Sequence, residues 1–266
     1  MGVSRHFAVA ATLWCASSAA EAADEQPICA DRPAKANSAC TVPAGHWQIE
    51  TGLADWTLDR SAGERDTLLV LGATAIKYAL SDRSNLEIDV TPYVKATGRF
   101  AGAHDSASGF GDVLVRYKRR LTRDDAPVEV AFYPFVKLPT AKHPLGNGKV
   151  EAGVEFPVSI NLGRSAFSLA FDPEVDLLAD SDRRGRHPAM VQVVDVNFAA
   201  NSRLSFTAEL WGRWNWDPAG TVRQASADGS IAYLVSNDVQ LDAGANFGLN
   251  RATPDVELYG GVSVRF

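Results

Sequence analysis

Apolar and polar residues alternate along most of the chain that follows residue 46. In the stretch NLEIDVTPYV, residues 85–94, the even positions from Leu86 to Val94 are apolar, while the odd positions from Asn85 to Thr91 are polar. Successive side chains of a β-strand point to opposite faces, so this period of two residues predicts a strand with one apolar and one polar face. The same clear alternation recurs in four other stretches: 150–162, 167–177, 203–216 and 238–249.

Weaker alternation fills the intervals, at 46–58, 66–80, 110–121, 128–138, 189–199, 228–235 and 255–266. Together these stretches predict about twelve strands over residues 46–266. Many of them are longer than the ~5–6 residues of a typical soluble strand and match the ~9–11 residues that cross a bilayer at a tilt. A soluble β-sandwich, the alternative fold, would use shorter strands and would hide their apolar faces in its core.

The predicted connections alternate between short and long. The tight ones are 81–84, 163–165, 200–202 and 236–237, and the long ones are 59–65, 97–109, 139–149, 179–188 and 217–227. Tight periplasmic turns and long outer loops are typical of outer-membrane barrels, and lipid tolerates no unpaired strand edge. The predicted fold is therefore all-β: a closed, up-and-down antiparallel transmembrane β-barrel of about twelve strands.

The first residues have the order of a secretory signal peptide. Arg5 precedes a 14-residue apolar stretch at 7–20, and small residues stand at Ala20 and Ala22. The stretch is too short to span a membrane as a helix, and a buried N-terminal helix is the alternative. We expect cleavage after Ala22, which divides the chain into a signal peptide (1–22), a periplasmic leader (23–45) and a barrel (46–266) in the outer membrane of a Gram-negative cell.

The chain ends on an aromatic residue, Phe266, that shares the parity of Leu258, Val262 and Val264. This parity predicts a lipid-facing ring at the periplasmic interface, within a girdle of aromatic side chains. A terminal Phe on an alternating strand also resembles the signal that the outer-membrane assembly machinery recognises. Lipid and that machinery are therefore expected partners.

Charge and cysteine content limit the other classes of function. The chain has 26 Lys and Arg against 32 Asp and Glu, a net charge of −6, and no basic tract, so nucleic acid is not an expected partner. Cys29 and Cys40 lie in the leader, and an isolated pair in an exported chain is expected to form one disulfide. Two thiols with no nearby His make a metal site the poorer interpretation, and no cofactor is expected.

The leader carries a family resemblance. The matching residues in DRPAKANSACTVPAGHWQIETG (31–52) are Asp31, Arg32, Pro33, Ser38, Thr41, Val42, Pro43, Gly45, Gln48 and Glu50, and further matches are 109–121, 135–140 and 231–250. These stretches resemble a family of exported barrels assigned as transporters and linked by name to the MetA pathway of phenol degradation. The resemblance implies an outer-membrane protein that passes small, often aromatic, molecules. It carries over no catalytic or binding residue, and Ala34 departs from the family's usual acidic or polar residue.

The polar strand faces predict which charged residues line the lumen. They are Glu87, Asp89, Arg116, Lys118, Glu151, Glu155, Asp172, Glu174, Asp176, Arg203, Glu209 and Arg213. An acidic wall on neighbouring strands would give an open pore a preference for cations. Alternatively, Glu87 and Asp89 pair across strands with Arg116 and Lys118 and simply fill the lumen.

Three functions follow from these patterns. We predict a channel for small-molecule solutes, with a filled barrel of structural or adhesive role as the alternative and an outer-membrane hydrolase as the third. An enzyme is not expected, because the histidines after the signal peptide (His46, His104, His143 and His187) fall in predicted loops or strand ends. Consecutive residues such as His104, Asp105 and Ser106 cannot form a catalytic triad by themselves.

Overall fold

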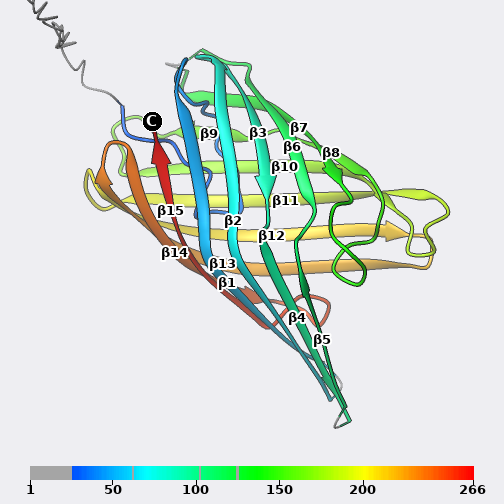
Figure 1. The fold of residues 1–266 in the computed structure, drawn as a ribbon. Helices are drawn as coiled ribbons and strands as arrows, with labels where there is room; N and C mark the ends of the chain where they lie inside the picture. Colours follow the sequence, from blue (N-terminus) through cyan, green and yellow to red (C-terminus); the bar gives the residue numbers. More distant parts are fainter. Residues whose placement is uncertain (1–25, 62, 102, 124–125) are drawn as a thin grey trace, which may run out of the picture.

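A computed structural model describes residues 26–61, 63–101, 103–123 and 126–266 as an antiparallel β-barrel (Figure 1). The predicted signal peptide at 1–22 and the first leader residues, 23–25, lie outside the described residues. Among the residues that the structure describes, no helix is long and apolar enough to cross a membrane.

The wall is a single sheet of fifteen strands. They are β1 (Trp47–Ser61), β2 (Glu64–Ser81), β3 (Ser84–Val90), β4 (Tyr93–Phe100), β5 (Ala103–Gly109), β6 (Val113–Arg120), β7 (Val128–Leu138), β8 (Glu151–Glu155), β9 (Val158–Asn161), β10 (Phe167–Ala179), β11 (Arg186–Ala199), β12 (Leu204–Asp217), β13 (Gly220–Ser236), β14 (Val239–Gly248) and β15 (Val256–Arg265). Three wall strands are interrupted, so that β3 continues into β4, β5 into β6, and β8 into β9. The barrel therefore has twelve strands, as the alternation predicted.

The first and last strands close the barrel. β1 pairs with β15 from Gln48 opposite Arg265 to Leu58 opposite Val256. Trp47 and Phe266 extend this pairing by two backbone hydrogen bonds, of 3.1 and 2.8 Å. The Phe266 ring is 65% exposed, as expected of a side chain on the lipid-facing surface.

Exposure along the strands is the inverse of that in a soluble protein. On β3, Leu86 and Ile88 are 40% and 41% exposed, while Glu87 between them is 4% exposed. Paired aromatic rings surround the end of the barrel that carries the tight turns: Trp47 with Tyr78, Phe132 with Phe156, and Phe167 with Phe198, at centroid distances of 4.5, 5.7 and 4.9 Å. Apolar side chains thus face lipid, the charged ones face the lumen, and the tight-turn end is the periplasmic end.

Three predicted outer loops are instead parts of strands. Residues 59–65, 97–109 and 217–227 form the ends of the β1–β2, β4–β5 and β12–β13 hairpins, whose pairing continues to Ser61 opposite Glu64, Phe100 opposite Ala103 and Asp217 opposite Gly220. Most residues in these segments are polar or small, so the segments lack the apolar alternation that predicts a strand, yet their described residues pair as strands. The predicted loops at 139–149 and 179–188 do contain irregular chain, between β7 and β8 and between β10 and β11.

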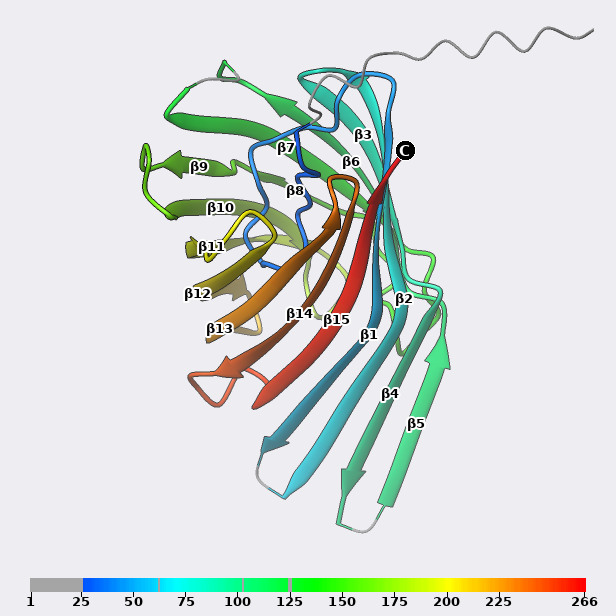
Figure 2. The ribbon, with the colours of Figure 1, turned by 90° about the vertical axis from the view of Figure 1, so that its left-hand side faces the viewer.

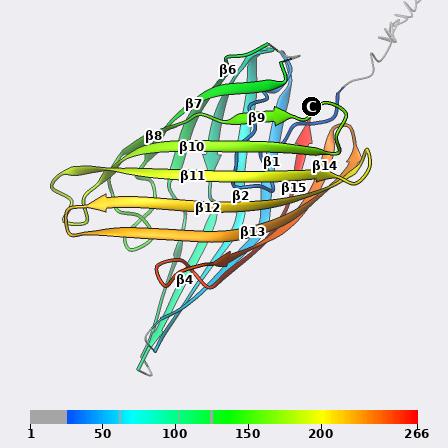
Figure 3. The same ribbon diagram turned by 180° about the vertical axis from the view of Figure 1, so that it is seen from behind.

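The extended hairpins make the outer mouth asymmetric. β2 is long enough to pair with two strands in succession. Its periplasmic half pairs with β3, and its outer half pairs with β4. β1, β2, β4 and β5 consequently project together beyond the rest of the barrel (Figure 2). On the opposite wall, β10, β11, β12 and β13 lie side by side (Figure 3).

The lipid-facing assignment predicts a position-dependent cost for charge. Val194 lies near the middle of β11, and Val235 lies at the periplasmic end of β13; both are exposed. We expect Val194→Arg to lower the free energy of unfolding by ~2–4 kcal/mol and Val235→Arg by ~0–1 kcal/mol, because the cost depends on depth in the bilayer. Denaturant unfolding in phospholipid vesicles measures both, and equal costs would contradict the assignment.

Candidate functional site

The described part of the predicted leader lies inside the barrel. Residues 26–46 have no regular secondary structure and enter the lumen from the periplasmic end (the blue segment inside the barrel in Figure 2). We call residues 28–41 the plug. Its side chains reach the wall on several sides, with Arg32 on Asp242 of β14 and Asp31 on Lys118 of β6. Thr41 and Ala44 bond to Asp82 in the periplasmic turn between β2 and β3.

Wall carboxylates accept the backbone N–H groups of the plug. Glu50 accepts those of Asp31 and Arg32, at 3.0–3.2 Å. Glu209 accepts those of Lys35 and Ala36, at 2.9–3.0 Å. An irregular segment cannot satisfy its own amides, and a buried N–H group without a partner is costly. The wall carboxylates therefore accept the hydrogen bonds of the plug amides, as the carbonyl groups of neighbouring strands do within the wall.

Ion pairs fix three plug side chains. Asp31 bonds to Lys77 at 2.5 Å and to Lys118 at 2.8 Å. Arg32 makes two bonds to Asp242, of 2.7 and 3.2 Å, in the paired geometry that suits a guanidinium and a carboxylate. Lys35 lies 3.0 Å from Asp228 and 4.8 Å from the centre of the Trp211 ring.

Two glycines make room for Arg32. A Cβ atom on Gly261 would lie 2.5 Å from the Arg32 guanidinium, and one on Gly52 would lie 3.1 Å from it. Both residues are on the paired strands that close the barrel, opposite each other in register. Any side chain at Gly261 would displace Arg32 or the backbone of Thr51, which is equally close.

The electrostatics of Asp31 favour its charged form. Burial alone would raise the pKa of its carboxyl, but the ammonium groups of Lys118 and Lys77 outweigh burial and hold that pKa well below its usual range. Ser38 adds two hydrogen bonds to the same carboxylate, from its amide and its hydroxyl. Asp31 is therefore ionised at any pH at which the barrel functions.

The disulfide predicted in the leader is present between Cys29 and Cys40, with a Cα–Cα distance of 6.5 Å. It joins the two ends of the plug, so that the residues bound to the wall form a closed loop. A 15-residue loop closed in this way gains ~3 kcal/mol relative to the open chain, and this shorter loop gains somewhat less.

Several of the predicted lumen residues meet at the plug. Arg116 bridges Asp89 and Glu155, at 2.6 Å each. Glu155 and Asp172 both accept the side-chain amide of Asn37, and Asp172 also accepts its backbone N–H. The cross-strand pairing of Asp89 with Arg116 is thus present, while Lys118 bonds to the plug.

The remaining predicted residues lie elsewhere in the barrel. Glu87 accepts the Tyr133 hydroxyl at 2.6 Å, and Glu151 bonds to Lys137 at 2.8 Å. Glu174, Asp176 and Arg213 lie together on β10 and β12. Arg203 is exposed in the turn before β12, so the structure does not bring it together with the others.

Five residues that bind the plug or belong to it were not predicted from the sequence. Lys77, Asp228 and Asp242 lie within strands, where periodicity assigns a face but no partner, and Lys35 and Asn37 lie in a stretch without periodicity. The family resemblance in residues 31–52 was the sequence feature that pointed to the contacts between plug and wall, because Asp31, Arg32 and Glu50 are among its matching residues.

The other motif residues hold the outer loop. Asp112 bonds to Lys137 at 3.0 Å and accepts the backbone N–H of Ala141 at 2.9 Å. The Thr140 hydroxyl donates to the carbonyl of Gly111 at 2.9 Å. The stretches 109–121 and 135–140 therefore meet at the start of the loop between β7 and β8.

Two cavities lie on either side of the plug. The outer one has a volume of about 240 Å³ and includes Glu50, Glu87 and Arg116 in its lining. The periplasmic one has a volume of about 380 Å³ and lies between the plug and the strands β7 and β9 to β14. Asp31, Arg32, Ala34 and Asn37 line both cavities, so this part of the plug is the partition between them.

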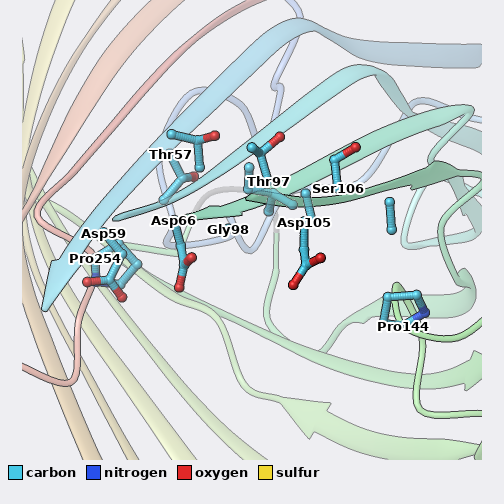
Figure 4. Close-up of a pocket in the computed structure, with 13 residues that line it drawn as sticks. Thr57, Asp59, Asp66, Thr97, Gly98, Asp105, Ser106, Pro144 and Pro254 are labelled. Carbon is cyan, nitrogen blue, oxygen red and sulfur yellow. The ribbon is translucent and has the colours of Figure 1, made fainter. Parts of the chain in front are cut away.

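A larger cleft of about 570 Å³ lies on the inner face of the projecting hairpins (Figure 4). Asp59 is opposite Asp66 in the pairing of β1 and β2. Gly98 on β4 is opposite Asp66 on one side and Asp105 on the other. The described lining of this cleft includes no Lys or Arg, so its row of carboxylates makes the cleft acidic.

The histidines show no hydrolase geometry within the described chain. His104 and Asp105 are neighbours on β5 and so point to opposite faces of the hairpin. His187 bonds through Nδ1 to Asp180 at 2.8 Å, but the nearby Ser181 hydroxyl donates to Asp217. Across the described ranges, no group of three or more His, Cys, Asp and Glu residues could hold a metal ion.

The role of Glu209 predicts a local effect on the plug. We expect Glu209→Ala to speed hydrogen exchange at the Lys35 and Ala36 amides by ~10-fold or more, since a hydrogen bond to a charged group contributes ~1.5–3 kcal/mol. Hydrogen exchange read by mass spectrometry measures it. Asp255→Ala, which removes a carboxylate bonded to Arg60 at the outer rim, is the matched control and should leave these amides unchanged.

The depressed pKa of Asp31 predicts a pH dependence. Ionised Asp31 stabilises the closed plug above its unfolded pKa of ~4, and this contribution is lost as the pH falls toward the lower folded value. The difference in plug-opening free energy between wild type and Asp31→Asn should therefore be constant from about pH 8 to 5, at ~3–5 kcal/mol, and should shrink below about pH 4. Hydrogen exchange at the amides of residues 31–39, normalised to the intrinsic rates at each pH, measures this difference. A difference that grows toward low pH would refute the stabilising role of ionised Asp31.

Comparisons with known proteins place the chain among outer-membrane barrels. The COG4313 outer membrane channel from Pseudomonas putida F1 is similar over 88% of this chain and 100% of its own, with a TM-score of 0.66 and 13% identity. The β domain of the Bordetella autotransporter BrkA is similar over 84% of this chain and 100% of its own, with a TM-score of 0.53 and 11% identity. These identities establish a shared fold alone. A search of curated proteins found no match.

A family model described as "Putative MetA-pathway of phenol degradation" matches residues 30–266. The match includes the plug from Ala30 onward together with the whole barrel, in agreement with the resemblance of the motif residues. It covers nearly all of the described chain. The chain therefore belongs to this family of outer-membrane β-barrels.

Proposed function

We propose that the protein is an outer-membrane channel for small molecules whose passage the plug controls. The observation that carries this proposal is the pair of cavities separated only by residues 31–37 of the plug. A barrel with a purely structural role has no need of space on both sides of a partition. Hydrogen bonds and ion pairs, which water can replace, hold the plug at several points, beside a small apolar cluster of Ala36 with Val191 and Val193.

The family description suggests the first solutes to test. Because it refers to phenol degradation, small aromatic compounds are the class we propose. The acidic outer cleft and the carboxylates of β10 favour solutes that are cationic or rich in hydrogen-bond donors. A barrel with a filled lumen and a structural or adhesive role is the second candidate, supported by the bridge from Arg116 to Asp89 and Glu155.

The assembly role of Phe266 is part of the same proposal. Its backbone pairs with Trp47 at the closing seam, and its exposed ring lies at the periplasmic rim. An aromatic residue in this place would be accessible to the assembly machinery until the seam forms.

Ion selectivity provides the test of the channel. We expect Glu174→Gln combined with Asp176→Asn to lower cation preference in planar bilayers while leaving heat-modifiable migration on gels intact, since neither carboxylate bonds to the plug among the described contacts. Arg203→Gln, a charge change in an exposed periplasmic turn, is the control. A folded double variant with unchanged selectivity would contradict the conducting acidic wall.

The pair Glu155→Gln and Asp172→Asn tests the plug in the same recordings. Both carboxylates bind Asn37, so this variant should raise conductance as well as lower cation preference. Absence of any conductance in wild type and in this variant would favour the filled barrel.

A further inference from the structure

We propose that the periplasmic cavity is a binding site for a small neutral molecule that carries two adjacent hydroxyl groups. The inference rests on the proposed channel function, because it names the class of solute that would pause in the lumen. It concerns only the cavity of about 380 Å³ between the plug and the strands β7 and β9 to β14, which has the size of a small-molecule site.

The lining of this cavity is rich in short neutral side chains that can form hydrogen bonds. Hydroxyls and amides project into it from four neighbouring strands: Ser159, Asn161, Ser168, Asn197, Ser205 and Thr207. Farther out on β10, beyond Asp172 that binds the plug, the lumen carries the carboxylates Glu174 and Asp176 instead. The two sides of the plug therefore differ in chemistry.

One buried carboxylate in this lining has no partner among the described residues. Asp195 of β11 lines the cavity, is 6% exposed, and forms no hydrogen bond or ion pair with any residue that the structure describes. Its neighbour across the strand pair, Glu209, is bonded to the plug amides of Lys35 and Ala36 and offers no compensation. The cavity lining contains one basic residue among its described members, Arg32, and its guanidinium is paired with Asp242.

A buried carboxylate without a partner is costly, so its retention points to a ligand that satisfies it. A carboxylate has two oxygens that each accept hydrogen bonds, and two adjacent hydroxyl groups can donate to both at once. The surrounding hydroxyl and amide groups would bind the remaining polar atoms, and Ala170 and Ala232 provide an apolar side. Asp31 and Glu129 also line the cavity, but Asp31 is paired with Lys77 and Lys118, and Glu129 accepts the side-chain amide of Asn161. A cation would therefore find one carboxylate without a partner and no aromatic ring in the described lining, so a neutral diol is the better match.

Calorimetry on the whole protein in detergent micelles tests the site without requiring conduction. The probes are catechol as an aromatic diol, glucose as an aliphatic one, phenol with a single hydroxyl, and benzylamine as a cation. We expect at least one diol to bind about tenfold or more tightly than phenol, because the diol donates one more hydrogen bond to the charged carboxylate of Asp195. Catechol and glucose distinguish an aromatic from an aliphatic solute.

Variants then locate the binding. Asp195→Asn should remove the preference for the diol over phenol, while Glu174→Gln, a lumen carboxylate beyond the plug, should keep it. Ser205→Ala with Thr207→Val keeps the charge and should weaken diol binding several-fold, which preserves the test if Asp195→Asn does not fold. Equal affinities for both diols and phenol, tighter binding of benzylamine, or unchanged diol binding in Asp195→Asn would each overturn the proposal. Loss of conductance alone would bear on the channel and not on this site.

Discussion

The bonds from plug amides to wall carboxylates are the interaction on which the interior of this barrel depends. A segment without secondary structure carries an unsatisfied N–H group at nearly every residue, and a lumen offers no neighbouring strand to accept them. Glu50 and Glu209 each accept two such groups, and Asp172 accepts a third set from Asn37. The plug can be irregular because the wall is acidic at these positions.

The dependence runs in both directions. Asp228 and Asp242 are buried carboxylates of the wall whose cationic partners, Lys35 and Arg32, belong to the plug. Removing the plug would leave these acids unpaired in the lumen, and removing the acids would leave the plug without anchors. Lys77 and Lys118 show the opposite arrangement, in which wall cations meet the plug carboxylate Asp31. Plug and wall are therefore complementary in charge, not only in shape.

Sequence periodicity predicted the wall well because lipid imposes a strict rule on each spanning strand. Alternation at Leu86, Glu87 and Ile88 is enough to assign both faces, and the twelve-stranded barrel followed from it. The rule ceases to apply outside the membrane, where residues 97–109 of the β4–β5 hairpin lack the alternation and were predicted to be a loop. It also fails for the plug, whose position depends on contacts with residues up to 210 positions away, such as Arg32 with Asp242. Local pattern contains no information about such pairs.

The disulfide has a consequence for how the lumen could open. A linear segment might leave a barrel one residue at a time, breaking one bond to the wall before the next. Residues 29 and 40 are joined, so the segment between them is a ring that cannot unthread. A ring that loses one anchor is still tethered by the others, so the lumen clears only when the ring as a whole moves away. In the proposed channel, this linkage would favour a change between two widths over a graded series of intermediates.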